Sequence, residues 1–356
     1  MLLIRAGAGT VGGIQRYGQS LTEALHDVAD LSVLDVGLDG TPAGRIRAFG
    51  KGLWAAARER PQLLLLGHVG LGPIGLASRL LGLRYAVLVY GIEVWGERSL
   101  LRRLVLERAS GVWAISRFTR SQVEERYPGS RPVQVIGGAV DRRFLAAQAE
   151  TSSDFRILSV ARAEHIWYKG VDTCAAAAGK LAVDHPLEYR IAGAVTEADK
   201  RSDVVRELGV DGSGGVVRWL GELDDDELLD EYRKASVVVL VSRFRGGSAP
   251  AGEGLGLAVL EGGAVGVPGI GSTIGGTTDC IVDGTTGYLV PPDDVDALQD
   301  RLRSLLENPP LRRSMGEHAR AWVAEHFSPE AFSVALAGAL AHALERPVLD
   351  VVEPQA

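Results

Sequence analysis

Cysteine is scarce in this chain, with only Cys174 and Cys280 among 356 residues. Two cysteines are too few for a disulfide scaffold and are typical of a protein from a reducing compartment. No basic segment followed by an apolar stretch opens the sequence, so we expect no secretory signal and a cytoplasmic location. The sequence starts almost inside its first predicted strand, which leaves open a start site further upstream.

A long hydrophobic run and an excess of positive charge are also missing. The most apolar segment, residues 63–92, is interrupted by His68, Pro73, Arg79 and Arg84, so we expect no membrane span there. The net charge of −7 argues against a general nucleic-acid binder. A hydrophobic content of 46% and a charged content of 23% are typical of a globular protein, and 356 residues usually form two domains.

Short apolar strands alternate with helical stretches along the chain, which predicts an α/β protein with doubly wound parallel sheets. The pattern restarts at Arg156 after the polar stretch 148–154, which we interpret as a linker between domains of residues 1–150 and 151–328. Residues 347–356 show no periodicity and are expected to form a flexible tail. Strands are predicted near residues 2–4, 31–36, 63–66, 85–89, 111–115, 133–136, 157–160, 189–191, 216–219, 237–241 and 269–270.

The most informative segment runs from Gly252 to Glu261 and carries two carboxylates, Glu253 and Glu261, eight residues apart. If residues 257–263 form a helix, the two acids lie up to about 12 Å apart along it. The start of that helix would favour an anion, because its backbone N–H groups are free. A nucleotide-diphosphate sugar, with hydroxyls at both ends and phosphates between, fits this spacing. The simpler alternative is an amphipathic helix with a surface glutamate at each end.

A second segment predicts a phosphate site further upstream. The apolar strand at residues 157–161 leads into Arg162, and Lys169-Gly170 precedes an alanine-rich helix at 174–181. A strand, a loop with two cations and a helix start together can bind phosphates. Taken alone, both cations would more often be solvated loop residues.

One motif indicates a different function. Gly7-x-Gly9-x-x-Gly12 follows a predicted strand and precedes a helix, and Asp35 lies near the end of the next strand. This arrangement is the fingerprint of a dinucleotide-binding site, which makes an NAD-dependent oxidoreductase the alternative function. The second half of the chain shows no constellation for hydride transfer. A tight turn is a simpler role for Gly12 and Gly13.

Three consecutive acids, Asp224, Asp225 and Asp226, resemble part of a metal site. They precede an apolar and acidic stretch that predicts a helix, where aspartates in the first turn satisfy free N–H groups and the helix dipole. We therefore interpret them as a helix cap and expect no metal.

Considered together, the motifs resemble the retaining family-four glycosyltransferases of the GT-B fold, the glycosyl transferases group 1. The resemblance covers about Gly12 to Phe327 and is most specific in the second half of the chain. It implies two Rossmann-like domains facing each other across a cleft, with a last helix at 329–346 packed back on the N-terminal domain. The matching motifs are Gly12-Gly13-Ile14-Gln15-Arg16, Tyr90-Gly91-Ile92-Glu93, Arg162-x6-Lys169-Gly170, Ala192-Gly193, Gly221-Glu222, Glu253-x7-Glu261 and Gly275-Gly276.

The resemblance also implies site roles. Arg162 and Lys169 would bind the donor diphosphate, Glu253 the donor sugar and Glu261 the nucleotide ribose. Arg162, Lys169 and Glu253 are thus the predicted catalytic residues, with retention of configuration, no metal, no further cofactor and a UDP- or GDP-linked sugar as donor. The other predicted donor contacts are Gly12, Gly13, Gly193, Gly254, Leu255, Gly256 and Leu257.

The acceptor side departs from the family pattern. Tyr90 stands where the family often has a histidine that touches the donor sugar, and His68 is the nearest alternative polar group at a strand end. The predicted acceptor-side residues are Gln15, Arg16, His68, Tyr90 and Glu93. The tyrosine leaves open a catalytically weak sugar-nucleotide binding protein. A nucleotide-sugar epimerase of the same fold is a further alternative, although the set Arg162, Lys169, Glu253 and Glu261 favours transfer.

A basic helix at residues 98–108 is compatible with a lipid-linked acceptor and peripheral binding to the inner face of a membrane. An ordinary solvated helix face explains the same pattern.

Overall fold

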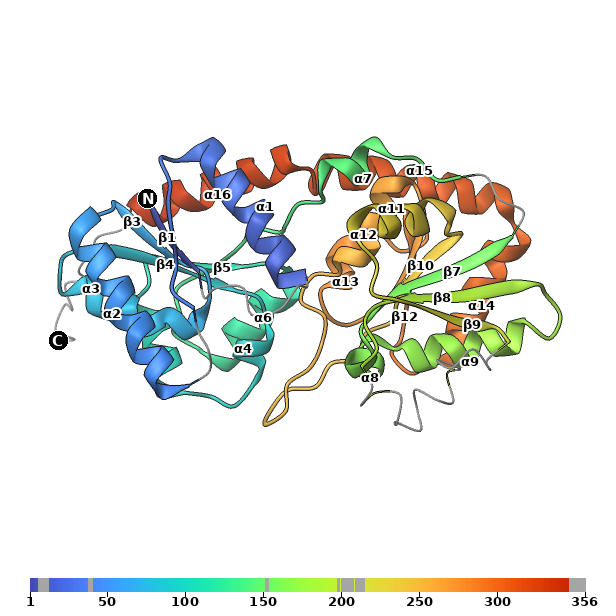
Figure 1. Ribbon diagram of the computed structural model, residues 1–356, viewed down its shortest axis with the longest axis horizontal. Coiled ribbons are helices and arrows are strands. Elements are labelled where there is room, and N and C mark those ends of the chain that lie inside the picture. Colours follow the sequence, from blue (N-terminus) through green and yellow to red (C-terminus); the bar gives the residue numbers. More distant parts are fainter. Residues whose placement is uncertain are drawn as a thin grey trace. The chain divides into compact units, whose positions relative to one another are not determined.

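The computed structural model describes residues 1–5, 13–37, 41–150, 154–196, 199, 208 and 215–345. These residues form two compact units. The first unit contains the described residues up to Ala139, the short segment Gly246–Pro250 and the helix that begins at Pro329. The second unit contains the described residues of Val140–Arg245 and Ala251–Ser328. Each unit is built on a parallel sheet with helices on both faces (Figure 1).

The sheet of the first unit has six parallel strands in the order β2-β1-β3-β4-β5-β6. All four leucines of β3 are buried, as expected for a parallel strand covered on both faces. The strand order reverses between β1 and β3, so their carboxyl ends flank a switch point of the sheet. The strands are β1 (Leu2–Arg5), β2 (Ser32–Asp35), β3 (Leu63–Leu66), β4 (Arg84–Val89), β5 (Gly111–Ala114) and β6 (Val133–Val135).

Small residues let helix α2 pack closely against its neighbours in this unit. In α2 the buried face consists of Gly44, Ala48, Gly52, Ala55 and Ala56, and a Cβ on Gly52 would lie 2.7 Å from the Ile74 side chain of α3. The helices are α1 (Gly13–Val28), α2 (Pro42–Glu59), η1 (Val69–Leu71), α3 (Gly72–Arg79), α4 (Ile92–Trp95), α5 (Leu100–Arg108), α6 (Arg117–Arg126) and α16 (Pro329–Glu345).

The sheet of the second unit also has six parallel strands, in the order β12-β11-β10-β7-β8-β9. Its order reverses between β10 and β7. The strands are β7 (Phe155–Val160), β8 (Leu187–Ala192), β9 (Val217–Gly221), β10 (Val237–Leu240), β11 (Gly269–Ser272) and β12 (Gly287–Val290). The helices are α7 (Arg142–Ala146), η2 (Ala163–His165), α8 (Ile166–Lys169), α9 (Val171–Leu181), α11 (Asp225–Lys234), α12 (Leu257–Val265), α13 (Thr277–Cys280), α14 (Val295–Glu307) and α15 (Pro309–His326).

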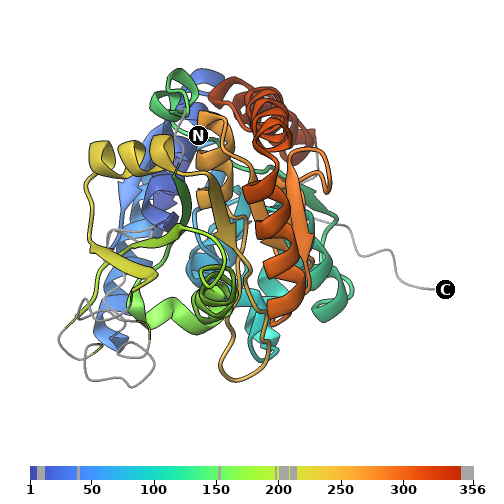
Figure 2. The ribbon, with the colours of Figure 1, turned by 90° about the vertical axis from the view of Figure 1, so that its right-hand side faces the viewer.

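Side chains of β10 alternate between two apolar layers. Val237 and Val239 belong to a buried cluster with residues of α9 and α14, whereas Val238 faces Gly262 of α12. In Figure 2 this unit is turned toward the viewer, with helix α11 in yellow and helix α14 in orange. The sheet is therefore covered on both faces, which agrees with its continuous apolar strands.

The predicted α/β class with parallel, doubly wound sheets is confirmed, and every predicted strand is present. Sequence patterns did not predict α2, α3 or β12. The stripe that α2 buries is made of glycine and alanine, so it lacks the large apolar residues that mark an amphipathic helix.

The division between the units falls before Val140, about ten residues earlier than the predicted boundary at 150. Backbone hydrogen bonds explain this difference. The N–H of Val140 donates to Phe327 O at 2.8 Å, and those of Ala149 and Glu150 donate to Val265 O and Arg233 O. Residues 140–150 are thus held to the second unit, and the predicted tail at 347–356 lies outside the described residues.

The last helix, α16, belongs to the first unit, where Ser333 Oγ donates to Asp27 of α1 at 3.2 Å. By length and composition alone, the stretch Pro309–Glu345 is apolar enough to cross a membrane. That stretch is two helices, and in α16 the side chains of Phe332, Leu336 and Ala343 are buried in the unit. Its apolar face is therefore used in packing.

Candidate active site

The predicted donor-binding residues of the second unit gather at the switch point of its sheet. Arg162 follows β7, and Ser242 follows β10, the two neighbouring strands between which the order reverses. Ligands of doubly wound proteins bind outside the carboxyl ends of strands at such points. The sheet topology thus places the loops that carry Arg162, Lys169 and Glu253 at the carboxyl ends of the neighbouring strands β7 and β10.

Lys169 is positioned by the glycine that follows it. Gly170 has a φ of 68°, and a Cβ there would lie 2.3 Å from Val241 O at the end of β10. Only glycine allows this approach, which brings the end of α8 against the switch point. Lys169 Nζ lies 3.3 Å from Glu253 Oε2. Burial lowers the pKa of Lys169, but Glu253, Tyr168 and Glu261 together outweigh it, so the pKa is raised and the amine is charged.

The loop that carries Glu253 rests on the segment before and within α13. Glu253 O accepts a hydrogen bond from Gly276 N at 2.9 Å, and Leu255 O accepts one from Cys280 Sγ at 2.8 Å. A Cβ on Gly276 would lie 2.2 Å from Gly254 O. Close backbone packing therefore fixes the Glu253–Gly256 loop.

Glu261 is a buried carboxylate within α12, an otherwise apolar helix. Its side chain is 7% exposed, and Tyr232 of α11 donates its hydroxyl proton to Glu261 Oε2 at 2.6 Å. The alternative of a surface glutamate at this position is wrong. Because burying a carboxylate is costly unless it is hydrogen-bonded, the Tyr232 hydroxyl stabilises Glu261 in this position.

The start of α12 lacks a side-chain cap. Gly256 occupies the N-cap with a φ of 100°, and in the described part of the chain no side chain caps this helix. Leu257 is the first helical residue, and the predicted helix is confirmed as Leu257–Val265. Uncapped N–H groups at a helix start are suited to an anion.

Arg162 is the N-cap residue of η2, and its Nη1 lies 3.8 Å from Glu164 Oε1. Beside it, burial lowers the pKa of His165, and the charges of Lys169, Arg162 and Glu253 act on the same imidazole. Gly193 follows β8, where a Cβ would lie 2.0 Å from Ala161 O. The three charged residues predicted to be catalytic, Arg162, Lys169 and Glu253, therefore all act on the His165 imidazole.

The predicted acceptor-side residues belong to the first unit. His68 accepts a hydrogen bond from Gly70 N at its Nδ1, at 2.9 Å, which leaves Nε2 as the protonated nitrogen of the neutral ring. The Glu93 carboxylate accepts from Tyr90 N at 2.6 Å and Gly91 N at 3.1 Å. Tyr90 itself is buried edge-to-face against Tyr17, and burial raises its pKa well above the ordinary value.

The structure describes only some of the other site residues that were predicted in the first unit. Gly13 and Arg16 lie in the first turn of α1. Gly12 and the glycine motif as a whole lie outside the described residues, as does the side chain of Gln15. Asp35, the acid of the dinucleotide alternative, pairs with Arg5 through two contacts of 2.9 and 2.7 Å. Its carboxylate is therefore already engaged.

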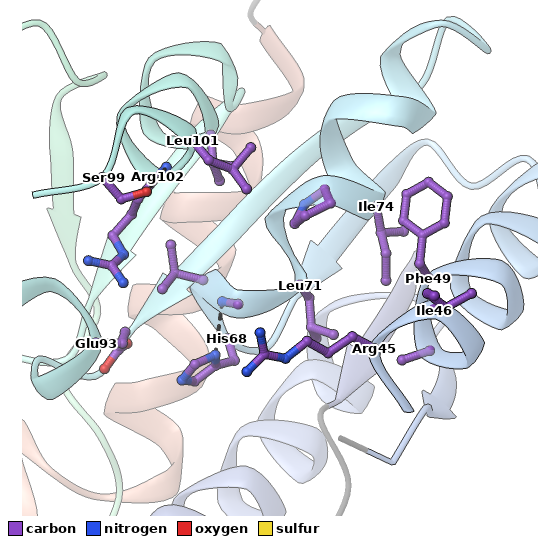
Figure 3. Close-up of a pocket in the computed structure, with 15 residues that line it drawn as sticks. Arg45, Ile46, Phe49, His68, Leu71, Ile74, Glu93, Ser99, Leu101 and Arg102 are labelled. Atoms are coloured by element: carbon purple, nitrogen blue, oxygen red, sulfur yellow. Dashed lines mark hydrogen bonds between the residues drawn. The ribbon is translucent and has the colours of Figure 1, made fainter. Parts of the chain in front are cut away.

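A cavity of about 710 Å³ opens in the first unit, with His68 and Glu93 in its wall. Figure 3 shows Ser99, Leu101, Arg102 and Glu93 on one side of it and Ile46, Phe49 and Ile74 on the other, with His68 and the Arg45 side chain between them. Sequence patterns identified His68 and Glu93 but not the residues of α2, because that helix was not predicted.

The cap predicted at Asp224 is confirmed. Its carboxylate accepts from Asp226 N at 3.0 Å and Glu227 N at 2.8 Å, and the Glu227 side chain accepts from Asp224 N. Across the described residues, no three His, Cys, Asp or Glu side chains are arranged to hold a metal ion.

Sequence reasoning missed Tyr232, His165, Gly276 and Cys280 as parts of this site. His165 lies within the predicted phosphate loop, and Gly276 within a quoted motif. Their proximity to Lys169 and Glu253 could have been suspected from those positions. No sequence motif indicates that Tyr232 and Cys280 belong to the site. They reach it only because α11 packs on α12 and α13 packs on the Glu253 loop.

Comparison with known proteins agrees with this geometry. The family model for glycosyl transferases group 1 matches residues 141–322. Glycogen synthase of Mycobacterium tuberculosis is 30% identical over 252 residues, which are 70% of this chain and 56% of that protein. A GDP-mannose-dependent monoacylated alpha-(1-6)-phosphatidylinositol monomannoside mannosyltransferase of Corynebacterium glutamicum is 29% identical over 66% of this chain and 62% of its own length. The chain thus spans little more than half the length of these relatives.

The fold is shared with solved structures. The structure of HepE from Anabaena in complex with UDP and glucose superimposes with a TM-score of 0.74 at 17% identity, over 96% of this chain and 99% of that one. With two parallel six-stranded sheets and a family match over half of its length, this chain is a GT-B protein that belongs to the glycosyl transferases group 1.

Proposed function

We propose that this chain transfers a sugar from a nucleotide-diphosphate sugar, UDP- or GDP-linked, to a hydroxyl acceptor, with retention of configuration and without a metal ion or other cofactor. The observation that carries the proposal is the contact between Lys169 and Glu253 at the switch point, next to the uncapped start of α12. A cation, a carboxylate and free backbone N–H groups at one position suit a ligand that has both phosphates and hydroxyls.

In the proposed reaction, the bond between the anomeric carbon and a diphosphate oxygen breaks, and its electron pair goes to the diphosphate. The acceptor oxygen bonds to the anomeric carbon on the same face, and its proton goes to the leaving diphosphate. Lys169 and Arg162 stabilise the charge that develops on that group, and Glu253 accepts hydrogen bonds from sugar hydroxyls. Glu261, oriented by Tyr232, binds the ribose. No protein nucleophile is required.

Two relatives support this class of donor. The Anabaena structure contains UDP and glucose, and the corynebacterial relative is named for its use of GDP-mannose. Both nucleotides therefore stand as candidates for this chain, and hexoses as candidates for the sugar.

A thermal-shift series with UDP, GDP, dTDP, ADP, their sugar conjugates and NAD(P), without added metal, tests the donor. A ligand at 100 times its dissociation constant should stabilise the protein by about 2.7 kcal/mol. We expect one nucleoside diphosphate and one of its sugar conjugates to stabilise the protein. Stabilisation by NAD(P) alone would support the oxidoreductase alternative instead.

Turnover then separates an enzyme from a sugar-nucleotide binding protein. We expect release of the nucleoside diphosphate from the identified donor to persist in EDTA, and NMR of the product to show the anomeric configuration of the donor. Donor binding without release of the diphosphate, over a range of hydroxyl acceptors, would indicate a binding protein. Inversion or loss of activity in EDTA would contradict those parts of the proposal.

A further inference from the structure

His165 is the single histidine in the sequence between Arg162 and Lys169. Its backbone N–H donates to Arg162 O at 2.9 Å, and it is the N-cap of α8, whose last residue is Lys169. Residues three and four positions apart are neighbours on a helical turn, and the His165 ring packs against the Tyr168 ring with centroids 4.9 Å apart. Lys169 Nζ lies 6.0 Å from the centroid of the same tyrosine ring. Burial raises the pKa of the Tyr168 hydroxyl, so the imidazole and the ammonium group lie against one uncharged ring.

The charges around this imidazole oppose one another. Arg162 and Lys169 disfavour a proton on the ring, and so does burial, which is the largest influence. The carboxylates of Glu164 and Glu253 favour a proton but do not outweigh burial and the two cations, so the pKa of His165 is lowered from 6.5 and the ring is neutral near pH 7. Nε2 lies 3.3 Å from Glu164 Oε1, whereas Nδ1 has no hydrogen bond with any residue that the structure describes.

A bound diphosphate would change this balance. Arg162 and Lys169 are the predicted diphosphate ligands, and they are also the two cations that oppose a proton on His165. A ligand with two negative charges offsets the charge of both cations and attracts a proton to the ring. Protonated imidazole can donate hydrogen bonds from both of its nitrogens, and Nδ1 is available for one. The site would therefore gain a third cation when it is filled.

We propose that His165 takes up a proton from solvent when a sugar nucleotide binds, and that the protonated imidazole binds the diphosphate beside Arg162 and Lys169. The proton adds to the lone pair of the neutral ring, and no bond of the ligand forms or breaks in this step. The inference rests on the proposed function in one respect, because it needs a diphosphate at this position. It does not require transfer of the sugar to an acceptor.

Calorimetry of the full chain with UDP-glucose and with GDP-mannose, without acceptor or added metal, tests the proton uptake. Both phosphates of these probes are diesters, so the charge of the probe does not change near neutral pH. Titrations near pH 7 in buffers of different ionisation enthalpy give the number of protons taken up. We expect at least about 0.5 proton per bound ligand for the wild type and less than about 0.1 for His165→Gln. Binding without proton uptake by the wild type would overturn the proposal.

Two control variants assign the proton to one group. His185 is a half-buried histidine of the same unit, 3.4 Å from Glu307, and it precedes β8 at the opposite edge of the sheet from the Arg162 loop. His185→Gln should keep the full uptake, and so should Glu164→Gln, which removes the carboxylate next to Nε2. Loss of uptake in Glu164→Gln together with its retention in His165→Gln would place the proton on the carboxylate. Equal losses in His165→Gln and His185→Gln would also contradict the assignment.

The pH dependence of affinity separates a bound proton from a merely structural role. Near pH 8 the wild type and His165→Gln should bind the probe within about twofold of each other, because the ring of the wild type then gains little charge. Near pH 6 the wild type should bind about tenfold more tightly, which corresponds to about one unit of difference in pKa between the free and the bound protein. An equal loss of affinity in His165→Gln at both pH values would reduce His165 to a structural residue and overturn the proposal.

The proposed transferase function fails or stands separately. Proton-linked binding of a probe without release of its nucleoside diphosphate to hydroxyl acceptors would contradict transfer and keep the role of His165. Transfer by a wild type that takes up no proton on binding the donor would keep the transferase function and overturn the role of His165.

Discussion

Lys169 and Glu253 lie 84 residues apart in sequence, yet Lys169 Nζ is 3.3 Å from Glu253 Oε2 and both side chains are less than one-fifth exposed. The sheet topology makes this contact, because α8 follows β7 and the Glu253 loop follows the neighbouring strand β10. The pair combines a charge suited to phosphate with one suited to sugar hydroxyls. Its two members are thus expected to affect different steps of the proposed reaction.

Replacing Glu253 by glutamine should lower kcat for sugar transfer by about 100-fold or more, since a neutral amide holds the donor sugar less well in the transition state. The dissociation constant for the free nucleoside diphosphate should change by less than about threefold. Steady-state kinetics and calorimetry measure the two quantities. The matched control is Glu317→Gln on the exposed side of α15, which should leave both unchanged. Unaltered turnover of Glu253→Gln would contradict the assignment.

Removing the hydroxyl of Tyr232 should weaken nucleotide binding through Glu261. The hydroxyl donates to Glu261 Oε2 at 2.6 Å, and loss of a buried hydrogen bond to a charged group costs about 1–3 kcal/mol. Tyr232→Phe should therefore lower the free energy of unfolding by that amount and raise the nucleotide dissociation constant up to about tenfold.

Tyr85 provides the control for Tyr232, because its buried hydroxyl donates to Val105 O at 2.6 Å in the first unit. Tyr85→Phe should lower stability to a similar extent without changing nucleotide affinity. If both variants weakened nucleotide binding equally, Tyr232 would have only a structural role.

The glycine after Lys169 should resist substitution. Gly170→Ala places a Cβ 2.3 Å from Val241 O at a φ of 68°, so it should destabilise the protein by about 2 kcal/mol or more. Gly179→Ala lies within α9 with no atom within 4 Å of the new Cβ, and it should stabilise the protein by about 0.5–1 kcal/mol. Urea denaturation followed by circular dichroism compares the two variants. Equal effects would contradict the close approach of Gly170 to β10.

Stability should fall at acid pH partly through His165. Burial lowers the pKa of His165, although Glu164 at 3.3 Å acts in the opposite direction. Below the ordinary pKa near 6.5 the unfolded chain binds a proton that the folded protein binds less readily, so stability rises with pH across that window and is lost below it. Lowering the pH from 7 to 5 should therefore destabilise the wild type more than His165→Gln. An equal loss in both, with exposed His318→Gln as reference, would exclude this contribution.

By itself, the sequence determined the fold class, the parallel sheets and the motif set around Lys169 and Glu253. Those features depend on local patterns, since apolar strands, glycine positions and helix starts repeat at short spacing. The cap at Asp224 was predictable for the same reason, because a capping box needs only four consecutive residues.

Only the tertiary structure decided which groups support that site. Tyr232 reaches Glu261 because α11 packs on α12, and Cys280 supports Leu255 because α13 packs on the Glu253 loop. The lining of the first-unit cavity also depends on α2, which buries glycine and alanine rather than large apolar residues and so leaves no stripe in the sequence. Contacts between distant segments depend on how helices pack on a sheet, and a local pattern does not contain that information.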